Sequence, residues 1–177
     1  MALTCDAQLV ASARRGSNAA FEQLARRHSP ALRSFLRGVC RDHAWADDVA
    51  QNTLIRAWQR LDQLNDPAAF KSWLFGTGWR LVSEDRRSAG RRSRREQDWS
   101  DTQEQLRPDG INADEKLALE AAMQELSPDQ RAVISLCLAG GWSHGEAAEV
   151  LDMPVGTIKS HIKRGRIKLL AALGEGE

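Results

Sequence analysis

The chain has 177 residues, 42% hydrophobic and 28% charged, a composition that is typical of a folded globular protein and excludes a disordered one. Its apolar runs are short and its beginning lacks a signal-peptide pattern, so we expect a cytoplasmic protein without direct membrane insertion. The formal net charge of +1 is a cancellation between segments: residues 1–95 hold 17 Lys and Arg against 9 Asp and Glu, residues 96–126 hold 2 against 9, and residues 127–177 hold 6 of each. A basic face needs only a local excess, so the small net charge does not exclude nucleic acid.

The first 95 residues predict an all-α domain, because helix punctuation recurs and no alternating β-branched run is present. Apolar residues at helical spacing predict helices over residues 5–15, 18–28, 30–40, 44–61 and 68–88. Ser29 and Pro30 are predicted to begin the third helix as its N-cap and first residue. Phe70, Trp73 and Leu74 are predicted to face inward in the fifth.

The helix predicted over residues 44–61 carries two acids and two amides near its beginning: Asp47, Asp48, Gln51 and Asn52. The helix dipole favours acids in a first turn, but it does not account for the amides beside them. Half of this cluster therefore lacks a purely structural explanation.

A basic run ends the helix predicted over residues 68–88 and continues beyond it. Trp79 and Arg80 precede this run, which contains Arg86, Arg87, Arg91, Arg92, Arg94 and Arg95. Such a run is usually a solvated face, but aromatics interleaved with cations are what stacking on unpaired bases requires. Within the same helix, Gly76 and Gly78 each cost about 1 kcal/mol relative to alanine.

Residues 96–112 are polar and acidic without a helical period, which predicts a flexible linker between two small helical domains. After the linker, the apolar spacing predicts helices over residues 113–125 and 128–139. Ser127 and Gln130 form a predicted capping box at the start of the second of these helices.

The stretch from Ser143 to Leu173 predicts a helix-turn-helix. Ser143 and Glu146 form a capping box for a short helix, and Asp152 to Pro154 predicts a tight turn. The next helix carries an apolar face at spacings of three and four, made of Ile158, Ile162, Gly165, Leu169 and Leu173. Its other side carries Lys159, Ser160, Lys163, Arg164, Arg166 and Lys168, with His161 beside them. A basic second helix is typical of DNA-binding helix-turn-helix motifs, although any helical hairpin with a solvated charged face gives a similar pattern.

Neither a catalytic site nor a metal site is predicted. No nucleophile and base pair is evident, and no His or Cys stands at ligand spacing with the acids that could be imagined as metal ligands, Asp47, Asp48, Asp62 and Asp66. We therefore expect no enzyme, no cofactor and no small-molecule substrate. Cys5, Cys40 and Cys137 form no CxxC pair, and the last two lie on apolar helical faces, which favours buried free thiols over a redox or zinc role.

In order and content, these pieces resemble the extracytoplasmic-function (ECF) sigma factors, the smallest sigma subunits of bacterial RNA polymerase. Four segments carry the resemblance: GSNAAFEQLARRH (16–28), DDVAQNTLIRAW (47–58), FKSWLFGTGWRLVSEDRR (70–87) and LSPDQRAVISLCLAGGWSHGEAAEVLDMPVGTIKSHIKRGRIKL (126–169). The resemblance implies a sigma region 2 bundle over residues 1–95, an acidic linker over 96–112 and a sigma region 4 helix-turn-helix domain over 113–177.

The resemblance also implies an alternative sigma factor that binds core RNA polymerase, directs initiation at promoter DNA and is controlled by an anti-sigma factor. Region 2 is implied to dock on the β′ coiled coil through Asp47, Asp48, Gln51 and Asn52. It is implied to melt the −10 element and capture a flipped base near residues 64–69, and the candidate contacts are Asn65, Trp79, Arg80, Arg86 and Arg87. Region 4 is implied to hold the β flap and to read the −35 duplex through Val155, Gly156, Thr157, Lys159, Ser160, His161, Lys163, Arg164 and Arg166.

Two positions depart from the family pattern. Trp79-Arg80 stands where members often have Arg-Asn, and Ser160-His161 stands where Ser-Arg is usual. The segment TIKSH (157–161) also resembles the helix-turn-helix of LuxR-type activators. Those proteins carry an upstream domain of alternating strands and helices, whereas only helices are predicted here, which favours the sigma factor.

Overall fold

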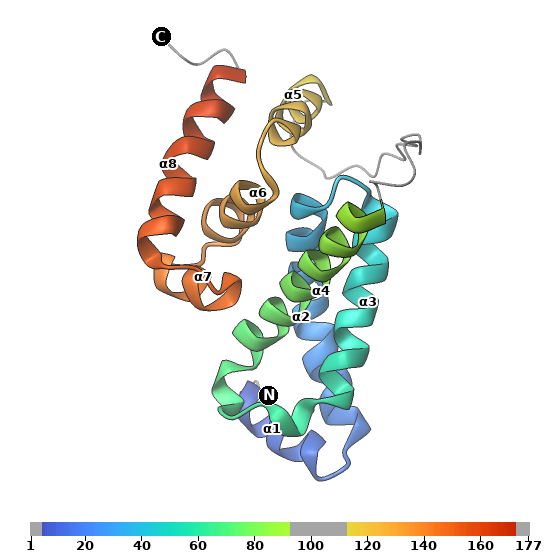
Figure 1. The fold of residues 1–177 in the computed structure, drawn as a ribbon. Coiled ribbons are helices and arrows are strands. Elements are labelled where there is room, and N and C mark those ends of the chain that lie inside the picture. Colours follow the sequence, from blue (N-terminus) through green and yellow to red (C-terminus); the bar gives the residue numbers. More distant parts are fainter. Residues whose placement is uncertain (1–4, 93–112, 173–177) are drawn as a thin grey trace. The chain divides into compact units, whose positions relative to one another are not determined.

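The computed structural model describes residues 5–92 and 113–172, which fall in two compact units (Figure 1). Among these residues, the first unit holds 5–36 and 44–92, and the second holds 37–43 and 113–172. Every regular element in the described ranges is a helix, as the all-α prediction requires. None of the helices described is both long enough and apolar enough to cross a membrane. The linker predicted over 96–112 lies outside the described residues.

The N-terminal part of the chain folds into four α-helices joined partly by short 3-10 turns. In chain order these elements are α1 (Asp6–Arg14), α2 (Asn18–Val39), α3 (His43–Gln59), η1 (Leu61–Gln63), η2 (Pro67–Ala69) and α4 (Phe70–Arg92). Large apolar side chains from α2 and α4 are fully buried in the core of the first unit, including Leu24, Leu32, Leu36, Phe70, Leu74 and Phe75. The rings of Phe35 and Phe75 lie 5.5 Å apart and join these two helices.

Helix α2 runs without a break through Ser29 and Pro30, so the prediction that a new helix begins there is wrong. One buried face continues through both halves of α2 at a spacing of four residues: Ala20, Leu24, His28, Leu32 and Leu36. Pro30 itself is exposed, so its ring lies on the solvent side. Burial of the continuous face offsets the roughly 3 kcal/mol that a proline costs inside a helix.

Helix α4 approaches α2 and α3 closely at Gly78. A Cβ atom built on Gly78 would lie 3.3 Å from Thr53 Oγ1 and 3.4 Å from Leu32 Cδ1, with no room for a larger side chain. The Thr53 hydroxyl is fully buried and donates to the carbonyl of Val49 at 2.7 Å. The glycine that weakens α4 as an isolated helix therefore allows the three helices to pack.

The C-terminal part of the chain contains α5 (Ala113–Gln124), α6 (Pro128–Ile134), the π-helical segment η3 (Ser135–Ala139), α7 (His144–Leu151) and α8 (Val155–Ala172). The capping box predicted before α6 is confirmed, because Ser127 Oγ accepts from the Gln130 N–H at 3.2 Å and Gln130 Oε1 accepts from the Ser127 N–H at 3.0 Å. The helix predicted over 128–139 is present, but its last five residues are wound as a π-helix.

Helix α8 packs against α6, α7 and α5 (Figure 1). Its predicted apolar face is confirmed for Ile158, Gly165 and Leu169, which are buried, whereas Leu173 lies outside the described residues. A Cβ atom on Gly165 would lie 3.1 Å from Ile134 Cδ1, so the glycine allows α8 to lie close to α6. Leu169 completes an apolar cluster with Ala122, Leu126 and Ile134.

Candidate nucleic-acid interface

Local hydrogen bonds fix the turn between α7 and α8. Ser143 Oγ accepts from the Glu146 N–H at 3.2 Å, and Glu146 Oε2 accepts from the Ser143 N–H at 2.8 Å, so the predicted capping box is confirmed. Asp152 ends α7 in the left-handed conformation, with φ of 53°, and the Met153 N–H donates to the carbonyl of Ala148 at 3.0 Å. The Thr157 N–H then donates to the carbonyl of Pro154 at 2.8 Å and starts α8. Two helices and a tight turn therefore form the predicted helix-turn-helix.

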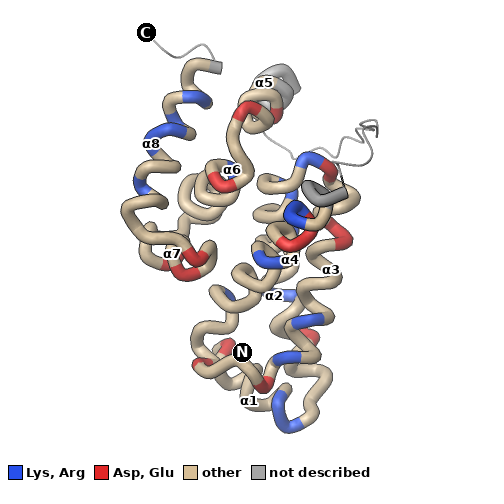
Figure 2. The backbone as a smooth tube through the Cα atoms, in the orientation of Figure 1, with Lys and Arg blue, Asp and Glu red and all other residues tan. Residues whose placement is uncertain are grey.

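Basic residues repeat along α8, while acidic residues occur on α7 (Figure 2). Lys159, Lys163 and Arg166 are exposed and spaced four and three residues apart, so they share one side of α8. Together with His144 they line a shallow groove whose floor and edges include Ile162, Ile167 and Leu170. Ile167 is 58% exposed, so this basic side also presents apolar surface.

The neighbouring side of α8 carries Ser160 and Arg164, four residues apart. The Arg164 Nε donates to the Ser160 carbonyl at 3.4 Å, and the Arg164 side chain is exposed. Val155 and Gly156 are exposed in the first turn of α8. The structure therefore brings most of the predicted −35 residues to the exposed part of one helix, where cations suit phosphates and small side chains suit base edges.

Three side chains of α8 lie at the border of its buried face instead. Thr157 and His161 are half-buried, and the Nδ1 atom of His161 is buried with no hydrogen-bond partner in the described part of the chain. A DNA contact of this ring would have to use its other edge. Lys168 Nζ donates to the carbonyl of Glu125 at 3.3 Å, so this ammonium caps the end of α5 rather than joining the outward basic side.

The polar cluster of α3 lies at the surface of the first unit. Asp48, Gln51 and Asn52 are exposed and Asp47 is half-buried. The same helix exposes two large apolar residues that were not predicted as site residues, Ile55 (53% exposed) and Trp58 (40% exposed). Ile55 follows Gln51 and Asn52 by one helical turn and lies off the inward face, which is the sequence signal that could have identified it. Exposed apolar residues beside a polar cluster are typical of protein–protein interfaces.

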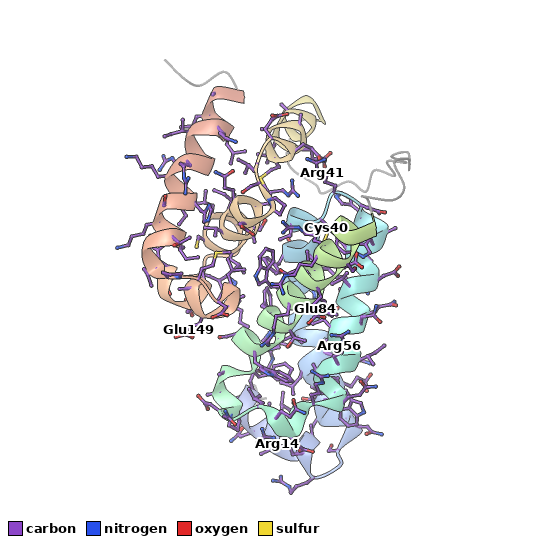
Figure 3. The ribbon with its side chains drawn as sticks, viewed as in Figure 1. Arg14, Cys40, Arg41, Arg56, Glu84 and Glu149 are labelled. Atoms are coloured by element: carbon purple, nitrogen blue, oxygen red, sulfur yellow. The ribbon has the colours of Figure 1, made fainter. Side chains whose placement is uncertain are left out.

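The predicted −10 residues are only partly brought together. Asn65 is exposed in the connection between η1 and η2. Arg80 and Arg87 are exposed and seven residues apart, so they share a face of α4, whereas Arg86 is exposed on a different face. Glu84 lies on the Arg80 face and forms an exposed ion pair with Arg56 of α3 at 3.5 Å (Figure 3).

Trp79 is not at the surface. Its side chain is only 6% exposed, because Phe75, Trp79 and Val82 continue the buried face of α4 at spacings of four and three. The ring is therefore unavailable for stacking on a base, and we remove it from the candidates. Trp73, which was predicted to face inward, is half-buried and seven residues before Arg80, so it is the aromatic residue on the Arg80 face.

The cysteines show no arrangement for redox or metal chemistry among the described residues. None of the three forms a disulfide within the described ranges; Cys5 is exposed, Cys40 is buried and Cys137 is half-buried. Burial raises the pKa of the Cys137 thiol above its ordinary value of 9.0, which disfavours the reactive thiolate. Within the described ranges, no three His, Cys, Asp or Glu side chains converge so that they could hold a metal ion.

Comparisons with known proteins match two family descriptions to two separate parts of the chain. Residues 24–92 match the family described as Sigma-70 region 2, and residues 116–169 match Sigma-70, region 4. The ECF RNA polymerase sigma factor SigL of Mycobacterium tuberculosis is 36% identical over 138 residues, which cover 76% of this chain and 78% of that protein.

Two solved structures resemble the whole fold. The sigma factor RpoE in complex with the anti-sigma factor NepR from Bartonella quintana matches with a TM-score of 0.78 and 30% identity, covering 87% of this chain and 96% of that one. CnrH in complex with the cytosolic domain of CnrY matches with a TM-score of 0.70 and 29% identity, covering 97% of this chain and 99% of that one.

A helical region 2 followed by a helix-turn-helix region 4 defines a transcription initiation factor of the sigma-70 class. The chain belongs to the ECF RNA polymerase sigma factors. The fold class and the sigma factor function predicted from the sequence are thereby confirmed.

Proposed function

We propose that this sigma factor binds core RNA polymerase and directs it to promoters by reading the −35 duplex with region 4 and opening the −10 element with region 2. The observation that supports this most strongly is the tight turn that presents the exposed basic side of α8. We assign region 2 to residues 1–95, the acidic linker to 96–112 and region 4 to 113–177. The polymerase carries out the catalysis, and the sigma factor positions the polymerase at the promoter and opens the DNA strands.

Region 4 would place the first turns of α8 in the major groove. Val155 and Gly156 are small enough for close approach to base edges, and an apolar contact with a thymine methyl suits Val155. Lys159, Lys163 and Arg164 are exposed and would contact phosphates on either side of the groove. His161 would contact the DNA only from the edge of the helix, since its Nδ1 atom is buried.

Region 2 would hold unpaired −10 bases between the η1–η2 connection and α4. Asn65 offers an amide that can both donate and accept a hydrogen bond, as recognition of a flipped base requires. Arg80 and Arg87 would contact the strand backbone, and Trp73 is the ring placed for stacking beside them.

The exposed side of α3 would dock on the β′ coiled coil of core polymerase. Asp48, Gln51 and Asn52 supply polar contacts, and Ile55 supplies apolar area at the end of the same surface. Region 4 would hold the β flap. The structures of related sigma factors with NepR and CnrY support control of this chain by an anti-sigma factor.

In vitro transcription tests this proposal. The purified protein with core polymerase should produce discrete transcription starts on genomic fragments, whereas core polymerase alone should not. Asp48→Lys should lower the affinity for core polymerase without changing the affinity of the free protein for −35 duplex, because α3 is distant in sequence from α8. An absence of starts above the core background would contradict the proposal.

A further inference from the structure

Helix α1 has no assigned part in promoter recognition, yet it contacts the connection that carries Asn65. It contacts η2, η1 and the helix α4 that follows them. Leu9, Val10 and Ala13 form its buried side. A helix of nine residues is too short to be stable alone, so these contacts determine its position.

The other end of α1 is anchored to α2 by an acid. Asp6 Oδ2 lies 2.7 Å from His28 Nε2, and Asp6 Oδ1 accepts from Arg27 Nη1. His28 is buried and its ring lies 5.6 Å from that of Phe70, where α4 begins. The beginning of α1 is therefore fixed to the core of the unit, and its last turn can act as a rigid support.

Arg14 lies in that last turn and reaches the η1–η2 connection (Figure 3). Its Nε and Nη2 atoms donate to the Leu61 carbonyl at 3.2 Å and 3.0 Å, and Nη2 also donates to the Leu64 carbonyl. Leu64 ends η1 with ψ of 109°, so its carbonyl leaves the helical direction and is not used by the turn itself. One guanidinium thus holds both ends of η1.

These contacts leave the next two side chains facing outward. Leu61 and Leu64 are each 4% exposed, while Asn65 and Asp66 are exposed. Asp66 Oδ1 accepts from the Ala68 N–H at 2.9 Å and caps η2, so the chain is fixed on the far side of Asn65 as well. In the described part of the chain the Asn65 amide has no hydrogen-bond partner, so its donors and acceptor are available to a ligand.

We propose that Arg14 is a positioning residue for −10 recognition: it fixes the Leu61–Asp66 backbone so that Asn65 is already in place for an unpaired base. This inference rests on the proposed function of region 2. A loop that is ordered before binding loses less conformational freedom when the base arrives, which favours both affinity and base preference. The planar fork of arginine can donate to two carbonyls at once, whereas lysine offers one compact ammonium.

The test uses the full-length protein with Arg14→Gln and Arg14→Lys, and Arg15→Gln as the matched control. Arg15 is adjacent and exposed, and its guanidinium donates to Ser12 Oγ at 3.3 Å rather than to the loop. Hydrogen exchange of the free protein should become faster over residues 62–69 in Arg14→Gln and stay unchanged in Arg15→Gln. This readout does not depend on any promoter.

Base preference is then measured by transcription from two promoter libraries, one randomised in the −10 element and one in the −35 element. Arg14→Gln should weaken the −10 preference by roughly tenfold, at the lower end of what a mismatched base costs in a recognition site, and leave the −35 preference unchanged. Arg14→Lys should give an intermediate loss. The Asn65→Ala variant should lose the same −10 base preference. The double variant with Arg14→Gln and Asn65→Ala should show no further loss of −10 preference beyond that of Asn65→Ala alone.

The outcomes separate the two proposals. If the wild-type protein directs no specific starts, the proposed function fails. If the wild-type protein selects −10 bases and Arg14→Gln selects them equally well, or if exchange over residues 62–69 does not change, Arg14 is not a positioning residue. If Arg14→Gln does not fold, Arg14→Lys decides: a −10 preference equal to that of the wild type overturns the proposal, and a selective loss supports it.

Discussion

At the residue scale, Gly78 sets how closely three helices of region 2 approach. The nearest atoms to a Cβ built there belong to Thr53, Leu32 and Leu36, so side chains of both α2 and α3 occupy the space that a side chain at position 78 would fill. The buried Thr53 hydroxyl is already bonded to its own helix and cannot move away without exposing a polar group to apolar surroundings. A larger residue at position 78 would therefore push the helices apart.

Gly78→Val should lower the free energy of unfolding by about 1–3 kcal/mol, since overpacking forces neighbouring side chains off their preferred rotamers. Urea denaturation followed by circular dichroism measures this change. Gly156→Ala is the control, because no atom lies within 4 Å of a Cβ built on Gly156. The control should be neutral or stabilising by up to about 1 kcal/mol. An equal loss in both variants would rule out crowding as the cause.

Single residues also show what sequence patterns could not decide. Tryptophan suits both a stacking surface and a core, and only the burial of its side chain in the folded unit shows that Trp79 belongs to the core. The contacts of Arg14 join residues 47 and 50 positions apart, and no local spacing indicates such a pair. By contrast, Asp48, Gln51 and Asn52 are exposed, as the docking role implied by the family resemblance requires.

At the element scale, the helix-turn-helix was predictable because its caps and its turn are local. Ser143, Glu146 and Asp152 each act within a few residues of their own position. The break predicted at Pro30 failed for the opposite reason, since the buried face that carries α2 through this proline is a property of tertiary packing. Local signals therefore determined helix ends in region 4 better than in region 2.

Ser143→Ala should destabilise α7 by about 1 kcal/mol, because the Glu146 N–H at its start loses the Ser143 Oγ that accepts from it. Because α7 supports α8, the affinity for −35 duplex should fall as well. Glu149→Gln is the control: it lies exposed in the same helix, outside the capping box, and should change stability by less than about 0.5 kcal/mol. Urea denaturation and duplex binding give the two measurements. Equal effects of both variants would contradict a specific contribution of the cap.

At the scale of the whole molecule, nearly balanced total charge conceals a strongly uneven distribution. Region 2 has a large excess of Lys and Arg, the linker and the start of region 4 have an excess of acids, and the basic residues of the last segment are concentrated on α8. Charges separated along a chain act on different partners, because screening limits each to its own neighbourhood at physiological salt.

The salt dependence of promoter binding should reveal which cations bind DNA. Lys159→Ala and Arg164→Ala should each reduce the slope of log affinity against log salt by about one unit for every phosphate that the cation neutralises in the wild-type protein. Lys168→Ala removes the same charge from the same helix, but its ammonium is bonded to the Glu125 carbonyl, so the slope should stay unchanged. Binding titrations at several salt concentrations measure the slopes. Identical slopes in all three variants and the wild type would show that this side of α8 does not face the DNA.

The π-helical segment Ser135–Ala139 also determines where the chain can become shorter. Because a π-helical turn holds about one residue more than an α-helical turn, its five residues rotate about as far as four residues of an α-helix. Deletion of one residue here could therefore restore ordinary α-helical winding while Trp142, whose N–H donates to the Leu136 carbonyl at 3.1 Å, stays buried. A single-residue deletion should be tolerated better in this segment than inside α8, where it would rotate everything after it by about 100° around the helix axis.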